Sequence, residues 1–430
     1  MATTRYPDER ERFVKDSRPL LAILLIMVIA VVPGFFLKRG ATPPNPAAAN
    51  VAADSGSSPA AANVAADSGL IADPESAARL AAAGGDPEFG STADTGSPAD
   101  IAIPDDTVVV RSALYEYRFS TRGAALVGAR FLRYKSMHPA DTAAGNQTQL
   151  ELIPAGEKLL DNRLIVGGDT VHFAATGFTA SSPEIVVTDS ATTLTFSGTV
   201  AGRPVAIDYR FVPDDYRIGV SGRMDGVGAN GATLLLGFGN GFGDTESNIA
   251  ENHRESGIVT KQHDTELTRF SSLDPLVPTV LSGPFEWVAV KSKYFVAGFF
   301  SYDSTGANSF QGRIGGVLAT ATDAAPAKPI RARTALTLPV AAAGEWGGTL
   351  YLGPMEYDRL TAMGHGFDDV NPYGWRGFRT VIRPFAVAIR SVFVWMHQTL
   401  GLHYGLAIVL FGVLIRILLW PLNQKAMRSM

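Results

Sequence analysis

Residues 205–220, VAIDYRFVPDDYRIGV, contain two runs in which apolar and polar side chains alternate, separated by the turn signal Pro-Asp-Asp. An alternation of this kind is typical of β-strands that bury one face. The same pattern occurs in YEYRF (115–119), and turn signals such as Gly-Gly-Asp at 167–169 separate the runs. Because no amphipathic helix interrupts them, the pattern predicts a large antiparallel β-sandwich within residues 107–363.

The composition of the 430-residue chain excludes several functional classes. Its net charge is −4, so the charge balance does not favour binding to nucleic acid, which requires a clustered basic face. The chain has no cysteine, which excludes disulfides, thiolate metal ligands and a cysteine nucleophile. The histidines show no metal-ligand spacing, and no cofactor is predicted. Hydrophobic residues make up 46% of the chain, an average share, so any membrane portion must be local.

The first apolar run extends from Leu20 to Leu37 and contains no charged residue. A cleaved signal peptide would have a shorter apolar core, followed by a small-residue cleavage site. Here Lys38 and Arg39 follow at once, so a retained signal anchor is favoured over the signal peptide. The excess of basic residues before the run places the N-terminus in the cytoplasm under the positive-inside rule.

Residues 38–106 are predicted to be a disordered linker. They are rich in Ala, Gly, Pro and Asp, and the decapeptide AAANVAADSG occurs in them twice. A segment with so few large apolar side chains cannot bury enough surface to fold.

The second apolar run lies within residues 403–422, where Arg416 is the one charged residue. The run is long enough for a helix to cross a bilayer. A guanidinium keeps its charge there, at a cost of about 3 kcal/mol on insertion scales. Taken alone, the charge leaves two interpretations open: Arg416 extends toward the headgroups, or it has a function inside the membrane.

Residues 373–399 are predicted to be an amphipathic helix lying in the membrane interface, before the second span. The arginines at 376, 379, 383 and 390 fall on one helical face, and aromatic and aliphatic side chains supply apolar surface. Pro384 is predicted to divide the helix into two pieces and to begin the second. The alternative is a helix packed on the β-domain.

Several segments resemble one protein family. Residues 416–430, RILLWPLNQKAMRSM, resemble the first core transmembrane helix of the YidC/Oxa/Alb membrane protein insertases, in which an Arg precedes a Pro-Leu pair and a basic stretch. Other segments are similar to parts of the large periplasmic domain of Gram-negative YidC: TRGAAL (121–126), FEWVAVKSKYFVAGFF (285–300), YLGP (351–354) and YGW (373–375).

The resemblance implies an all-β supersandwich of galactose-mutarotase-like fold, held outside the cytoplasm between two transmembrane helices of the bacterial inner membrane. It implies an insertase and chaperone without covalent chemistry, which assists integral membrane proteins alone or with the Sec translocon. Its partners would be nascent membrane proteins, the Sec translocon and the lipid bilayer. The residue implied to bind substrate is Arg416, in a hydrophilic groove.

The predicted segments, in order, are a cytoplasmic N-terminus (1–18), a signal-anchor helix (19–37), the linker (38–106), the periplasmic β-domain (107–363), the interfacial helix (373–399), a second transmembrane helix (403–422) and the start of a cytoplasmic region (423–430). Members of the family continue with further helices. The chain is therefore expected to be the N-terminal portion of an insertase that does not insert proteins unaided.

Two alternatives to an insertase stay open. One is a membrane-anchored carbohydrate-binding or carbohydrate-active protein, for which a His acid and a Glu base are needed. The cluster 251–255, ENHRE, has the right residue types, and His172 and His263 are further candidates, but no order or spacing selects a pair. The other is a non-enzymatic module that docks on the translocon.

Overall fold

The computed structural model describes residues 105–143, 148–301, 314–322, 328–371 and 379–427. They belong to two compact units: a β-domain that ends at Asn371, and a second unit that contains the two C-terminal helices. The predicted cytoplasmic N-terminus, the signal anchor and nearly all of the linker lie outside the described residues.

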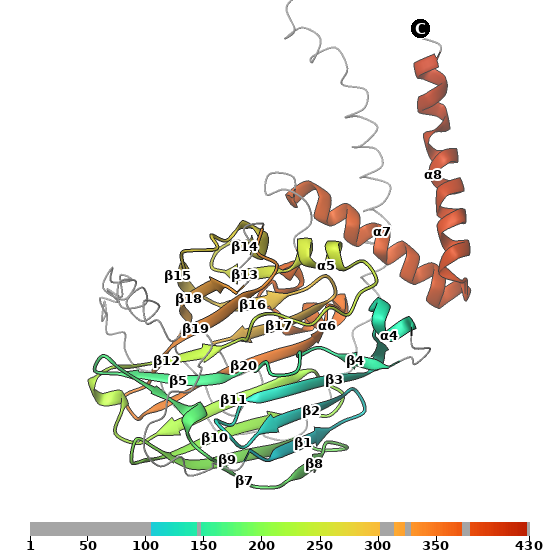
Figure 1. The fold of residues 1–430 in the computed structure, drawn as a ribbon. Coiled ribbons are helices and arrows are strands. Elements are labelled where there is room, and N and C mark those ends of the chain that lie inside the picture. The colour runs from blue at the N-terminus through green and yellow to red at the C-terminus, as the bar shows by residue number, and fades with distance from the viewer. Residues whose placement is uncertain (1–104, 144–147, 302–313, 323–327, 372–378, 428–430) are drawn as a thin grey trace, which may run out of the picture. The chain divides into compact units, whose positions relative to one another are not determined.

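The elements of the β-domain alternate between strands and a few short helices (Figure 1). The strands are β1 (Thr107–Arg111), β2 (Tyr115–Ser120), β3 (Leu126–Lys135), β4 (Gln149–Glu151), β5 (Asp161–Val166), β6 (Asp169–His172), β7 (Thr179–Ala180), β8 (Glu184–Val186), β9 (Thr192–Val200), β10 (Arg203–Phe211), β11 (Arg217–Met224), β12 (Ala232–Gly237), β13 (Gly257–Lys261), β14 (Thr265–Arg269), β15 (Thr279–Phe285), β16 (Trp287–Lys291), β17 (Phe295–Phe300), β18 (Ile314–Ala321), β19 (Ala332–Val340) and β20 (Glu345–Pro354). The helices are α4 (Pro139–Ala143), α5 (Ile249–Glu255) and α6 (Tyr357–Met363), with 3-10 turns η2 (Phe173–Ala175), η3 (Gly228–Asn230), η4 (Phe270–Ser272) and η5 (Phe367–Val370).

The described strands form three sheets. The largest has nine strands in the order β14-β13-β16-β17-β20-β11-β10-β9-β7. A five-stranded sheet has the order β4-β3-β2-β1-β8, and a six-stranded sheet has the order β15-β18-β19-β12-β5-β6. In the nine-stranded sheet, β20 pairs with both β11 and β17, so this last strand joins an earlier and a later group of strands.

The two smaller sheets pack against the same face of the nine-stranded sheet. Phe295 and Phe299 on β17 are four residues apart and therefore point to the same side. Phe295 packs on Phe131 of the five-stranded sheet, with ring centroids 5.4 Å apart. Phe299 packs edge-on against Phe238, which follows β12 of the six-stranded sheet, at 6.5 Å. The core of this sandwich is filled by fully buried aromatic side chains.

The end of the β-domain chain folds back over the other face of β17. Phe367 of η5 packs edge-on against Trp287 at 5.0 Å and against Phe300 at 4.7 Å. The space for this ring exists because position 298 is a glycine, whose missing Cβ would overlap the Phe367 ring. The contact fixes residues 367–370 on the sheet, close to the point where the chain leaves the domain.

The structure confirms a mostly β sandwich, as the alternating pattern predicts. Among the described strand pairs, one departs from the predicted antiparallel arrangement, because β8 pairs parallel to β1. A long connection separates these two strands, which allows the chain to return to the same end of the sheet before it pairs. The short helix α6 lies at Tyr357–Met363, where the sequence EYDRLTAM is helical in character.

The second unit contains α7 (Arg379–Leu400) and α8 (Tyr404–Met427), which residues 401–403 connect. The first of these, Gly401, has a φ of +64°, which suits a residue without a side chain. The prediction that Pro384 divides the first of these helices is wrong, because α7 continues through it. Pro384 is the sixth residue of α7, so its ring removes one backbone hydrogen bond while the helix beyond it retains the rest. Among the helices of the described residues, none combines the length and apolar character needed to cross a membrane.

Candidate functional site

Arg416, the residue predicted to bind substrate, lies on α8 with an exposed side chain. Large apolar side chains of the same helix are exposed beside it, with Val413 at 51% and Ile417 at 61%. Exposing several large apolar side chains on one helix to water is unfavourable, so this surface of α8 is suited to an apolar environment. The role of Arg416 stays a prediction.

The sequence cluster Glu251–Glu255 lies entirely within helix α5 and forms its C-terminal part. The His253 ring nitrogen Nε2 lies 2.7 Å from Asp244 Oδ1, and Glu251 Oε2 accepts a hydrogen bond from Lys293 Nζ at 2.8 Å. The histidine and the carboxylate that an acid–base mechanism would use therefore each have another partner. Lys293 lowers the pKa of the Glu251 carboxyl through this hydrogen bond and its charge.

The other two candidate histidines lie elsewhere in the domain. His172 is the last residue of β6, an edge strand of the six-stranded sheet. His263 lies in the turn after β13, whose five residues separate it from α5 by about 17 Å. The structure therefore does not bring either histidine into a common site with His253. Within the described residues, no three His, Asp or Glu side chains are grouped to hold a metal.

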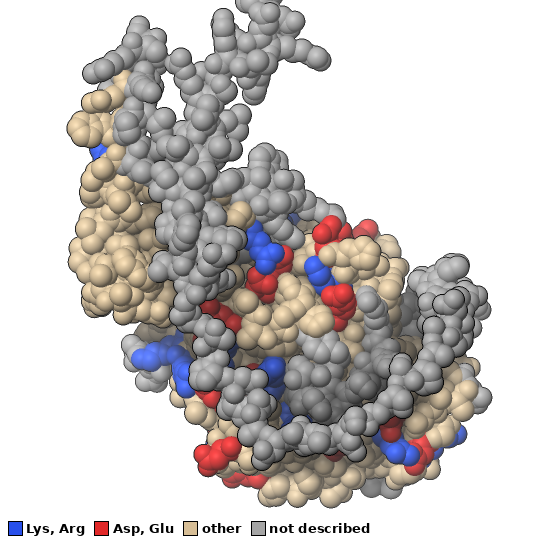
Figure 2. Space-filling view, turned by 180° about the vertical axis from the view of Figure 1, so that it is seen from behind, with Lys and Arg blue, Asp and Glu red and all other residues tan. Residues whose placement is uncertain are grey.

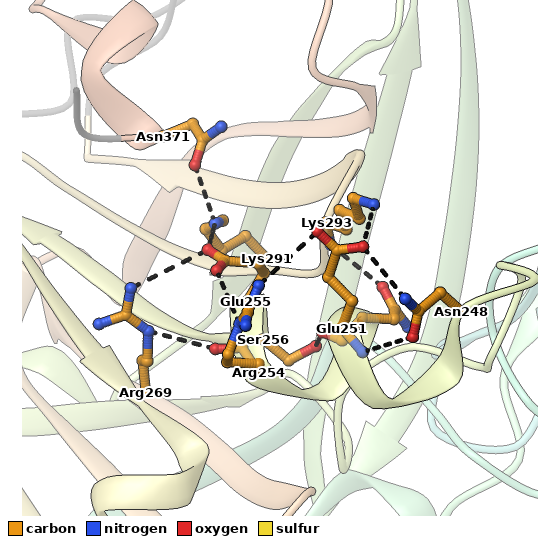
Figure 3. Close-up of polar contacts among 10 residues, drawn as sticks. Asn248, Glu251, Arg254, Glu255, Ser256, Arg269, Lys291, Lys293 and Asn371 are labelled. Atoms are coloured by element: carbon orange, nitrogen blue, oxygen red, sulfur yellow. Dashed lines mark hydrogen bonds and ion pairs between the residues drawn. The ribbon is translucent and has the colours of Figure 1, made fainter. Parts of the chain in front are cut away.

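Helix α5 is fixed by polar contacts at both of its ends and by one buried side chain of its own (Figure 3). Asn248 is the N-cap, and its Oδ1 accepts the Glu251 backbone N–H at 3.1 Å. Asn252 is buried, and its Oδ1 accepts the backbone N–H of Lys293 at 3.2 Å, which connects α5 to the turn between β16 and β17. At the other end, Arg269 Nε donates to the Arg254 carbonyl at 3.2 Å. A cation at the carbonyl end of a helix is favourable because it opposes the helix dipole.

Lys291 is a buried cation that the sequence interpretation missed. Its side chain is fully buried, and Nζ donates to Asn371 Oδ1 at 3.1 Å, while Glu255 Oε2 lies 4.0 Å away (Figure 3). Burial lowers the pKa of the Lys291 ammonium to about 8, and Glu255 opposes the shift. The signal was present in the sequence, since Lys291 ends the otherwise apolar run WVAVK, each residue of which is buried.

These contacts lie together at one end of the nine-stranded sheet, hereafter the α5 end, comprising α5, Arg269, the turn 291–294 and Asn371. Strand register shows why they meet: Gly257, the first residue of β13, is paired with Arg269 on one side and with Lys291 on the other. Asn371 is the last described residue before α7. The buried Lys291–Asn371 bond therefore fixes the place where the chain leaves the β-domain.

A polar cavity of about 490 Å³ lies near the α5 end. Its lining residues are Arg130, Ser136, Asp141, Thr148, Gln149, Glu151, Asp244 and Thr245. Its charged side chains have protein partners, such as Arg118 with Glu151 at 2.7 Å. On the face seen in Figure 2, several described Lys and Arg side chains likewise lie directly beside Asp or Glu.

Comparisons with known proteins give one consistent family. The family model described as the YidC periplasmic domain matches residues 107–387. A protein named membrane protein insertase YidC from Syntrophus aciditrophicus is 25% identical over 427 residues, covering 96% of this chain and 72% of the relative. One from Chlorobaculum tepidum is 25% identical over 342 residues, covering 76% of this chain and 54% of the relative, so the chain spans little more than half of that protein.

Among solved structures, a galactose mutarotase related enzyme from Lactobacillus acidophilus is similar, with 10% identity and a TM-score of 0.31. The similarity covers 57% of this chain and 97% of that enzyme, and at this level it does not extend to function. The family match, in contrast, covers all the strands of the three-sheet β-domain and continues into α7. The chain therefore belongs to the YidC periplasmic domain family.

Proposed function

We propose that this chain is part of a membrane protein insertase and that it assists the insertion and folding of integral membrane proteins. The observation that carries the proposal is the family match over residues 107–387, which covers both the β-domain and the first part of α7. The names of the two relatives supply the activity. The proposed location is the bacterial inner membrane, with the β-domain in the periplasm.

We further propose two membrane spans, residues 19–37 and 403–422, with α7 lying in the periplasmic interface. The second span is supported by apolar side chains of α8 that are exposed: Leu406, Ile408, Val409, Leu410, Val413, Leu414, Ile417 and Trp420. The rest of this span includes residues whose side chains lie outside the described part of the chain. On α7, the exposed Ile389 and Trp395 supply the apolar surface that an interfacial helix requires.

Arg416 would act on the polar flank of an arriving membrane segment. Transferring an acidic or polar flank out of water is costly unless it finds a hydrogen-bond partner. A guanidinium provides donors and a compensating charge for that flank. The apolar part of the client then moves into lipid because leaving water is favourable for it. No covalent step is involved, and the chain would act alone or beside the Sec translocon.

The carbohydrate alternative is not favoured by the site geometry. A sugar epimerisation needs a free acid and a free base facing a common space. His253 and Glu251 instead have separate partners, Asp244 and Lys293.

The activity can be tested in a complete homologous chain reconstituted into liposomes. Replacing the arginine aligned with Arg416 by Ala should lower the yield of a small inserted test protein about tenfold, which is about 1.4 kcal/mol. An Arg→Lys variant should keep part of the activity, because it retains the charge but not the planar donor group. The matched control replaces the residue aligned with Leu414 by Ala. Leu414 is two positions from Arg416 and therefore lies on another face of α8, so this variant should keep the yield of inserted protein. Equal yields from the Ala variant and the control would contradict the role of Arg416.

A further inference from the structure

The loop Asp274–Pro278, sequence DPLVP, presents two apolar side chains to solvent. Leu276 is 91% exposed and Val277 is 58% exposed. The loop is ordered at its base, where the buried Leu273 donates its N–H to the Phe270 carbonyl at 3.0 Å. The Leu276 N–H donates to Asp274 Oδ1 at 2.8 Å. These contacts hold the two apolar side chains in an outward position, and nothing in the loop itself covers them.

This loop lies at the α5 end of the nine-stranded sheet. It follows η4, which begins directly after Arg269, the last residue of β14. Arg269 is paired with Gly257, which is also paired with Lys291, and Lys291 holds Asn371. The exposed apolar loop and the exit of the chain are therefore at the same end of the domain.

The length of chain after Asn371 limits how far this end can lie from α7. Arg379, the first residue of α7, follows Asn371 by eight residues (379 − 371). A fully extended chain of that length spans at most about 28 Å. If α7 lies in the interface, as the proposed function has it, Asn371 at the α5 end must lie within that distance of the membrane surface.

We propose that the α5 end faces the bilayer and that Leu276 and Val277 enter the interfacial layer of the lipid. The inference rests on the proposed function for the position of α7, and it adds a second lipid contact made by the β-domain itself. Tyr294 in the turn after β16 is 49% exposed at the same end, and the Lys293 ammonium lies 5.0 Å from its ring centre. Tyrosine and lysine side chains are suited to the headgroup level, with apolar side chains entering below them.

The chain has no cysteine, so each position can be labelled singly without further changes. The full chain would be reconstituted into vesicles of phosphatidylethanolamine and phosphatidylglycerol that contain a lipid with a nitroxide at the headgroup. Four variants would carry an environment-sensitive fluorophore: Leu276→Cys, Val277→Cys, Val186→Cys and Ile389→Cys. Val186 is the matched control, since it is 59% exposed on β8 in the five-stranded sheet, compared with 58% for Val277.

The labels at 276 and 277 should be quenched about twofold more than the label at 186, as expected within roughly 10 Å of the headgroup layer. The label at 389 on α7 reports on the proposed function separately. Quenching at 389 without quenching at 276 and 277 would overturn this inference and leave the proposed function intact. No quenching at any position would overturn the placement of α7, and the inference with it.

Two further outcomes would also overturn the inference. Equal quenching at 186, 276 and 277 would mean that the domain adsorbs to lipid without a preferred face. Labels at 276 and 277 that are shielded from water but not quenched, and whose shielding falls when the protein is diluted in lipid, would assign the loop to a second copy of the chain.

Discussion

Lys291 has the least expected environment of the charged residues discussed above. A buried ammonium loses its hydration, and here one amide oxygen at 3.1 Å and a carboxylate at 4.0 Å replace it. Burial therefore favours the neutral form, which explains the direction of its pKa shift. The bond to Asn371 gives this costly arrangement a structural use, because it ties the last described residue of the β-domain to the end of strand β16.

Lys291 should make the β-domain more stable as the pH rises from 8 to 9.5. Its pKa is about 8 in the folded state and 10.5 ordinarily, so the unfolded chain binds more protons in this range. The rise in the free energy of unfolding should be on the order of 2 kcal/mol, and Lys291→Met should remove it. Urea unfolding of the full chain in detergent, followed by tryptophan fluorescence, measures this.

The matched control is Lys293→Met, which should keep the rise. Glu251 raises the pKa of Lys293 above its ordinary value of 10.5. The contribution of Lys293 to the free energy of unfolding is therefore lost only at a pH above that value, outside the measured range. The measurement stops at pH 9.5 because of the buried tyrosines. Burial raises the pKa of Tyr216, for example, to about 12. Above pH 10 such tyrosines lower the free energy of unfolding as the pH rises, which would oppose the effect of Lys291. A pH-independent stability in the unsubstituted chain would contradict the assignment.

Gly222 on β11 should not tolerate a side chain. A Cβ at this position would overlap the indole ring of Trp346, which is buried on the paired strand β20. Gly222→Ala should lower the free energy of unfolding by about 1–3 kcal/mol, as overpacking does elsewhere. Ser221→Ala, on the adjacent and less buried position, serves as the control and should change it little. Equal stability of the two variants would show that the indole can move aside.

At the scale of the element, α5 depends on its cap. Asn248→Ala removes the acceptor of the Glu251 backbone N–H and should cost about 1 kcal/mol of local stability. The amide of Glu251 should then exchange with solvent hydrogen about fivefold faster in the native state. Ser247→Ala, one residue earlier and exposed, should leave that exchange rate unchanged. If both variants exchange alike, the helix is held by its contacts to β16 and not by its cap.

The elements also show which features can be predicted from sequence. Period-two alternation predicts strands such as Val205–Phe211 because each strand buries one face, and this is a local property. The continuity of α7 through Pro384 could not be predicted from the sequence. A proline is compatible both with the first turn of a helix that begins there and with the early part of a helix that began a few residues before it. The Lys291–Asn371 bond joins residues 80 positions apart, which no local pattern reveals. Arg416 rests on the family resemblance and stays a prediction.

At the scale of the whole molecule, the segment between Asn371 and Arg379 should limit how the β-domain reaches the membrane. Inserting twelve Gly and Ser residues after Asn371 would extend this reach by about 40 Å. Lipid quenching of a label at position 276 should then fall toward the level at 186, while the label at 389 stays as before. The same insertion within residues 40–106, which are predicted to be a linker, should change neither label. Undiminished quenching at 276 would mean that the loop binds lipid without help from the connection.

The position of β20 determines when the β-domain can complete its fold. Among the described strands, β20 alone connects the earlier strands β7, β9, β10 and β11 to the later strands β13, β14, β16 and β17, because it pairs with β11 on one side and β17 on the other. The nine-stranded sheet therefore cannot close until the chain has been synthesised as far as Pro354, the last residue of β20. In the proposed periplasmic location, the nine-stranded sheet can therefore form only after both groups of strands and the later β20 have crossed the bilayer.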